Sequence, residues 1–86
     1  MAKIAEADRL IAERDALTDD RLRMLHREHM ESPYVTNPLS EERFRQTYRR
    51  FLSVEIAAWK ALESGDNEAY FQWDRESQRL CAWLGY

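Results

Sequence analysis

The chain has very little cysteine, proline or glycine, and it has no long apolar run. Its 86 residues include one cysteine, two prolines and two glycines. Because Cys81 is the only cysteine, no disulfide can form within the chain, and we expect a reducing compartment, by default the cytoplasm. No stretch reaches the roughly 18 uncharged apolar residues of a membrane-spanning helix. Residues 1–15 also lack the apolar run of a signal peptide. The sequence therefore predicts one small cytoplasmic domain with no contact to a membrane.

Neither sign of charge is in large excess. The net charge of −3 gives no general attraction to nucleic acid or to a membrane surface. The charge is unevenly spread, however: residues 1–20 and residues 51–86 each sum to −3, whereas residues 21–50 carry seven arginines and sum to +3. A basic middle segment thus lies between two acidic ends.

Two similar stretches mark where helices begin. LTDDRL (Leu17–Leu22) and LSEERF (Leu39–Phe44) each contain a hydroxyl residue, Thr18 or Ser40, that can accept a hydrogen bond from an unpaired backbone N–H of the first helical turn. Acidic residues follow each hydroxyl residue, and apolar residues flank the motif as a hydrophobic staple. We interpret the similarity as capping chemistry rather than as an internal duplication.

The spacing of apolar residues at about 3.6 positions predicts an all-α protein. The expected helices cover residues of about 3–17, 18–30, 41–64 and 67–84, with a loop at 31–39 that contains two prolines. The apolar spacing continues through Thr18, so one long helix over residues of about 3–30 would also satisfy the pattern. We expect two abutting helices or a kink at Thr18. Gly65 leaves only a short turn before the last helix. We therefore predict a compact three- or four-helix bundle with an antiparallel C-terminal helical hairpin.

Two histidines lie three residues apart in the second predicted helix. His26 and His29 share a helix face, where they could bind one metal ion. A metal site would need two further ligands, and only Cys81 and Glu55 are suggestive. Histidines on an inward face are more often buried and hydrogen-bonded, so we predict neither a metal nor a cofactor.

Glu55 lies near the centre of the apolar face of the third predicted helix. A buried carboxylate needs a partner, which could be Arg14, His26 or His29. Alternatively, Glu55 and the two histidines could form the polar part of a dimer seam. The sequence contains no Ser/His/Asp arrangement and no paired carboxylates. We therefore predict no catalytic residue and no enzymatic activity.

Arginine and aromatic side chains are the candidates for binding a partner. The ten aromatic residues are many for so short a chain, and aromatic rings with arginine are typical of protein-binding surfaces. Ile56 lies away from the main apolar face of its helix and could add to such a surface. The predicted partner-binding residues are Arg45, Arg49, Arg50, Phe71, Arg75, Trp83 and Tyr86.

No motif in the sequence identifies an activity. The composition favours a small non-enzymatic protein that binds a larger protein complex as a regulator or inhibitor, and that forms a homodimer. By analogy of type alone, phage-encoded inhibitors of host or defence proteins belong to this class. The alternative is a helical protein that binds nucleic acid through the arginine-rich segment at residues 21–50.

Overall fold

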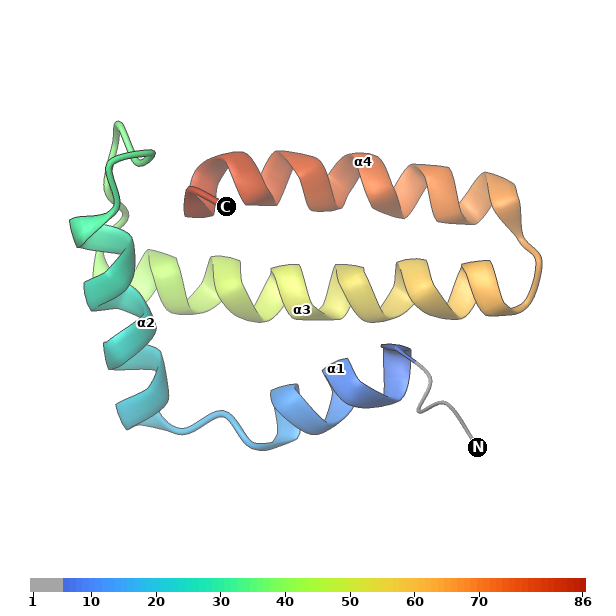
Figure 1. The fold of residues 1–86 in the computed structure, drawn as a ribbon, viewed down its shortest axis with the longest axis horizontal. Coiled ribbons are helices and arrows are strands. Elements are labelled where there is room, and N and C mark those ends of the chain that lie inside the picture. The colour runs from blue at the N-terminus through green and yellow to red at the C-terminus, as the bar shows by residue number, and fades with distance from the viewer. Residues whose placement is uncertain (1–5) are drawn as a thin grey trace.

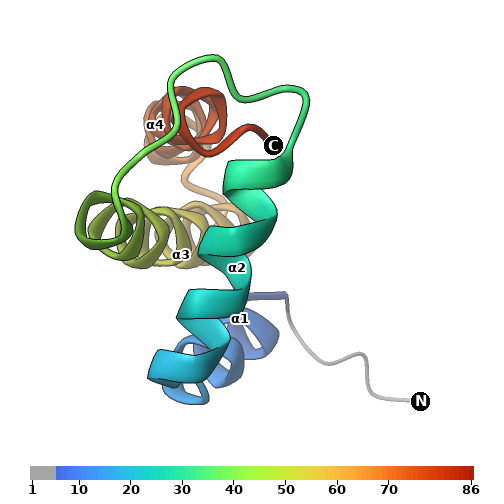
Figure 2. The same cartoon turned by 90° about the vertical axis from the view of Figure 1, so that its left-hand side faces the viewer.

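The described part of the chain folds into four helices (Figure 1). The computed structural model describes residues 6–86, which contain α1 (Glu6–Asp15), α2 (Asp19–Glu31), α3 (Glu41–Glu63) and α4 (Asn67–Leu84). Helices α3 and α4 run antiparallel, and α1 packs on the opposite side of α3 from α4. Helix α2 crosses one end of the other three helices (Figure 2). The predicted all-α bundle and its antiparallel C-terminal hairpin are confirmed.

The two predicted N-caps are both formed. The Thr18 hydroxyl accepts a hydrogen bond from the backbone N–H of Arg21 at 3.1 Å, and the Ser40 hydroxyl accepts one from Arg43 at 3.2 Å. Thr18 has an extended backbone, which separates α1 from α2. Of the two alternatives for this region, the structure therefore has two helices. The first helix ends at Asp15 rather than at the expected residue 17, and residues 3–5 of the expected range lie outside the described residues.

The turn between α3 and α4 is short and contains Gly65, as predicted. Gly65 adopts a positive φ of 80°, which is the left-handed conformation that favours glycine at the end of a helix. The Asp66 carboxylate then accepts a hydrogen bond from the N–H of Ala69 at 3.1 Å and caps α4. This short turn sets α3 and α4 side by side.

Helix α3 is the central helix, and its buried face is broader than the sequence indicated. It packs against α1 and α2 as well as α4, so side chains around much of its circumference are covered. Ile56 is only 5% exposed, and the expectation that it lies on the surface is wrong because α1 adds a second contact face to α3. The largest fully buried side chains are Phe44, Leu22, Leu52, Leu84 and Val54.

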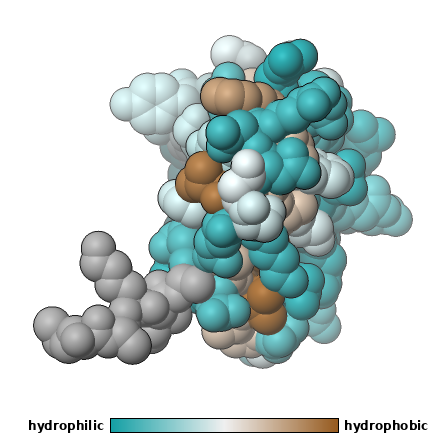
Figure 3. Space-filling model, turned by 90° about the vertical axis from the view of Figure 1, so that its right-hand side faces the viewer, coloured by the Kyte–Doolittle hydropathy of each residue, from teal (hydrophilic) through white to brown (hydrophobic). Residues whose placement is uncertain are grey.

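The molecule is thin. Its extents are 37 × 25 × 20 Å, and the smallest of these equals about two helix diameters. At the α3–α4 turn the surface is mostly hydrophilic, with hydrophobic residues separated from one another (Figure 3). None of the described helices combines the length and the apolar character that crossing a bilayer requires.

Candidate protein-binding site

A buried histidine holds the loop between α2 and α3 against the end of α4. His29 is 3% exposed, and its Nε2 accepts a hydrogen bond from the backbone N–H of Leu39 at 2.8 Å. Its Nδ1 lies 3.1 Å from the carbonyl oxygen of Leu84 and must donate, because a carbonyl only accepts. The two partners therefore define a neutral ring. One side chain thus joins α2, the end of the loop and the last turn of α4.

His26 reinforces the same contact. Its Nε2 donates to the carbonyl oxygen of Leu39 at 2.8 Å, so the two histidines bind both polar groups of one backbone residue. Both rings pack on Phe44, with centroid distances of 5.4 Å for His26 and 5.1 Å for His29. Both nitrogens of His29 are occupied by backbone groups, and residues 6–86 contain no group of three potential metal ligands. The histidines act as anchors of the loop.

Three exposed aromatic rings belong to the loop and to the end of α4. Tyr34, in the loop, is 82% exposed, and Trp83 and Tyr86, at the C-terminal end, are 49% and 61% exposed. The Tyr86 ring also makes an edge contact with Phe51 at a centroid distance of 5.7 Å. Large aromatic groups that remain exposed on an ordered segment are candidates for contact with another protein.

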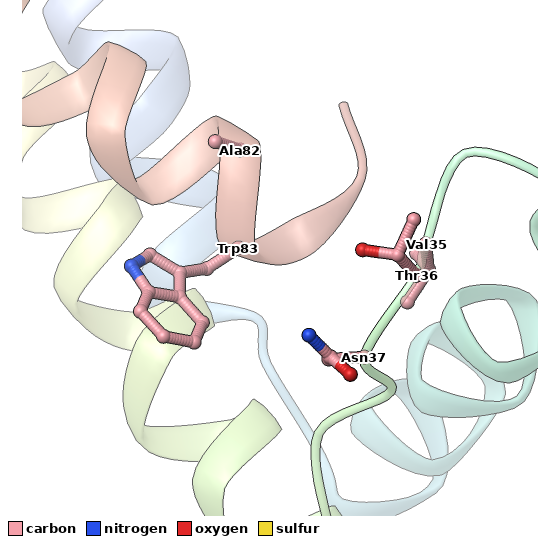
Figure 4. Close-up of a pocket in the computed structure, with 5 residues that line it drawn as sticks. All are labelled: Val35, Thr36, Asn37, Ala82 and Trp83. Atoms are coloured by element: carbon pink, nitrogen blue, oxygen red, sulfur yellow. The ribbon is translucent and has the colours of Figure 1, made fainter.

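Three surface cavities adjoin these rings. The first, of about 230 Å³, lies between the loop and α4, where Asn37 faces Trp83 across the opening (Figure 4). A second, of about 420 Å³, is lined by Tyr34, Cys81, Ala82, Gly85 and Tyr86. The third, of about 220 Å³, is lined by Leu39, Arg43, Thr47, Arg79, Leu80 and Trp83. We refer to the exposed residues around these cavities as the Trp83 surface: Tyr34, Thr36, Asn37, Arg43, Arg79, Ala82, Trp83 and Tyr86.

The close approach of the loop to α4 depends on a glycine. Gly85 ends α4 with a positive φ of 81°, and a Cβ atom at this position would overlap Cγ2 of Val35. The other positive-φ glycine, Gly65, has open space at the same position. Gly85 therefore supplies both the left-handed turn and the room that lets Val35 pack against the end of α4.

The three predicted arginines of the basic segment lie outside the Trp83 surface. Arg45 forms ion pairs with Asp19 at 2.8 Å and Glu41 at 3.0 Å, and so connects α2 to α3. Arg50 lies over the ring of Trp73 at 5.9 Å, and Arg49 is exposed. These contacts do not test whether the three arginines bind a partner, so that role stays a prediction.

Phe71 and Arg75 lie on the same helix as Trp83 but at a distance from it. Phe71 is 59% exposed and precedes Trp83 by twelve residues, which corresponds to about 18 Å along α4. Arg75 is exposed between them. Trp83 and Tyr86 therefore both lie at one end of α4, whereas Phe71 lies nearer the other end.

Sequence reasoning missed Tyr34 and Arg79 as members of this surface, and it considered Arg43 only as part of the arginine-rich segment at residues 21–50. Tyr34 carried a usable signal, because a large aromatic residue in a short loop between Pro33 and Pro38 has few ways to become buried. No sequence signal indicated that Arg43 and Arg79 lie close together, because they come from different helices and meet only through the packing of α3 on α4.

Glu55 has a different partner from those expected. The hydroxyl of Ser77, on α4, donates a hydrogen bond to its carboxylate, so the predicted pairing with Arg14, His26 or His29 is replaced by a contact within the hairpin. Burial raises the pKa of the neighbouring Cys81 thiol, although a hydrogen bond with Ser77 acts in the opposite direction. A raised pKa keeps Cys81 in the thiol form, which is the unreactive form.

No family model matches this chain, and comparison with curated proteins and with solved structures gives no similar protein. The chemistry of the described side chains is therefore the basis for any assignment of function.

Proposed function

We propose that this protein acts by binding another protein through the Trp83 surface, as a small regulator or inhibitor without an activity of its own. The observation that carries the proposal is the group of exposed rings, Tyr34, Trp83 and Tyr86, at one end of the fold. Aromatic residues are enriched among the residues that contribute most of the energy in protein interfaces. Cavities beside the rings offer space for side chains of a partner.

The loop that carries Tyr34 is held against the helices by contacts within the chain. His26 and His29 fix Leu39 at the end of the loop, and Val35 packs close to Gly85. A surface that is already ordered loses less conformational entropy on binding, so more of the contact energy appears as affinity. This supports a role for the loop in recognition.

The proposal is tested by capture from an extract of the cells in which the protein occurs. Tagged wild-type protein and Trp83→Ala are compared, with Met24→Ala as the matched control, since Met24 is an exposed apolar residue of α2, 45% exposed. We expect the same protein to be captured by wild type and Met24→Ala and lost with Trp83→Ala. A purified candidate partner should then bind wild type at least tenfold more tightly than Trp83→Ala. Equal capture by both variants would contradict the proposal.

Phe71→Ala measures how far the binding surface extends. If Phe71→Ala also weakens binding, the contact runs along the exposed face of α4 toward the α3–α4 turn. If only Trp83→Ala weakens it, the contact is confined to the Trp83 surface. Circular dichroism of each variant shows whether the helix content is retained.

Self-association is the second part of the proposal. The thin fold leaves side chains of α4 exposed, and a second copy could cover them. Size exclusion with light scattering at low and high salt gives the mass in solution, and a monomer at both would exclude a homodimer. The alternative function, nucleic-acid binding through residues 21–50, predicts an affinity that falls steeply as salt rises.

A further inference from the structure

We propose that the cavity formed by Arg43, Arg79 and Trp83 binds an acidic segment of a partner protein. An apolar side chain of the segment would lie against Trp83, and an adjacent carboxylate would lie between the two guanidinium groups. This inference rests on the proposed function, because it specifies the chemistry of the partner at the Trp83 surface.

The cavity combines an apolar base with a cationic rim. Leu39 and Leu80, which are 9% and 5% exposed, contribute the apolar lining, and the half-exposed Trp83 contributes an aromatic wall. The remaining lining residues are Thr47 and the two arginines. An apolar group can therefore be buried while a negative charge stays at the rim, where it need not lose all of its hydration.

The charge of the cavity is unbalanced in favour of an anion. Its lining contains two arginines and no carboxylate. Arg43 forms no ion pair within residues 6–86. Arg79 is held by Glu76, one turn earlier on α4, with N–O distances of 2.6 and 3.0 Å. A carboxylate of a partner would therefore pair with Arg43 and compete with Glu76 for Arg79.

The surroundings of the cavity favour an acidic protein segment over nucleic acid. The neighbouring cavity at the start of α3 is lined by residues of both signs, three acidic and two basic: Asp19, Glu41, Glu42, Arg23 and Arg45. Acidic residues therefore interrupt the positive charge at the start of α3, whereas a phosphate backbone, which carries a charge at every nucleotide, favours a continuous basic track. A short acidic segment needs only the two arginines at Trp83.

The test uses nuclear magnetic resonance with two short blocked peptides as probes. One peptide is Asp-Leu-Asp and the other is Asn-Leu-Asn, which keeps the apolar side chain and removes the charge. The protein has three tryptophans, so three indole N–H signals can be assigned with single Trp→Phe variants. We expect Asp-Leu-Asp to shift the Trp83 signal saturably and to leave Trp59 and Trp73 unchanged. Equal shifts with Asn-Leu-Asn, or no shift at Trp83, would overturn the inference.

Charge variants give effects of opposite sign. Arg43→Gln and Arg79→Gln should each weaken binding of Asp-Leu-Asp by about threefold to fivefold, as expected for partly exposed ion pairs. Glu76→Gln should tighten it, because Arg79 is then released from its carboxylate. Arg27→Gln, on the exposed side of α2, is the control and should have no effect. If Arg43→Gln and Arg79→Gln both bind Asp-Leu-Asp as tightly as wild type does, the inference is overturned.

A single-stranded oligothymidylate serves as the competing probe. A shift of Trp83 with this probe but not with Asp-Leu-Asp would overturn the inference in favour of nucleic acid. Failure of the inference is distinct from failure of the proposed function. If capture of a partner is lost with Trp83→Ala but unchanged with Arg43→Gln and Arg79→Gln, the proposed function stands and the acidic-segment inference falls.

Discussion

His29 and Leu39 are joined by a buried hydrogen bond in which the histidine ring accepts the backbone N–H at 2.8 Å. The opposite nitrogen of the same ring donates to the carbonyl oxygen of Leu84 at 3.1 Å. The ring therefore links the loop between α2 and α3 to the end of α4. Within the described residues, no buried side-chain nitrogen or oxygen is left without a partner. This polar contact fixes the geometry of the Trp83 surface although no part of the ring is available to a ligand.

Replacement of His29 by alanine should therefore be strongly destabilising. The substitution leaves the N–H of Leu39 and the carbonyl of Leu84 buried without partners and opens a cavity, at a cost of about 2–4 kcal/mol. In a domain of this size, thermal unfolding followed by circular dichroism should show a melting temperature lower by about 10 °C or more. His26→Ala is the control, because His26 makes one hydrogen bond and is less buried. An equal loss in both variants would contradict the prediction.

The two glycines with positive φ provide a matched pair. Gly65→Ala and Gly85→Ala both place a side chain in the left-handed region, which costs about 1–2 kcal/mol in each case. Only Gly85→Ala adds an overlap with Val35, so it should lose more stability and should also change the fluorescence of Trp83. Urea unfolding of both variants measures the difference, and similar midpoints would indicate that Val35 moves aside without cost.

Tyr48 should make the fold sensitive to alkaline pH. Burial raises the pKa of Tyr48 well above the ordinary value of about 10, and its hydrogen bond to Glu13 at 3.0 Å acts in the same direction. The folded state therefore favours the protonated tyrosine. This contribution to stability is complete below the pKa of the unfolded chain and is lost as the pH rises above about 10.

The measurement compares wild type with Tyr48→Phe in urea at neutral pH and above pH 10. The variant lacks the hydrogen bond to Glu13 and should be less stable by about 1 kcal/mol at neutral pH. The difference in the free energy of unfolding between wild type and Tyr48→Phe should become smaller at alkaline pH, because only the tyrosine of the wild type titrates. A constant gap across the range would show that Tyr48 does not contribute to the alkaline transition. Partial desolvation of the Tyr86 hydroxyl and nearby negative charge, including that of Glu28, also raise the pKa of Tyr86, so part of the transition should remain in the variant.

The contact between Glu55 and Ser77 should couple α3 to α4. A double-mutant cycle with Glu55→Ala and Ser77→Ala should give an interaction free energy of about 1–2 kcal/mol, as for a hydrogen bond to a charged acceptor. Urea unfolding of the four proteins supplies the values. Additive effects would indicate that Glu55 is stabilised by water or by a second subunit instead.

The sequence by itself determined the helical class and the places where helices begin and end. Thr18, Ser40, Gly65 and Asp66 act within one helical turn of their own positions, so their effects can be read from neighbouring residues. The exposure of Trp83 and Tyr86 at the C-terminal end was also predictable, because Trp83 flanks the apolar face of the last helix and Tyr86 follows the end of that helix.

Only the tertiary structure decided which distant residues meet. Glu55 pairs with Ser77 rather than with a charged group, Ile56 is buried, and His29 binds Leu39 and Leu84. Each of these outcomes depends on the packing of separate helices, which the periodicity of a single helix does not specify. The Trp83 surface has the same origin, because its arginines come from α3 and α4 and its loop is positioned by a histidine of α2.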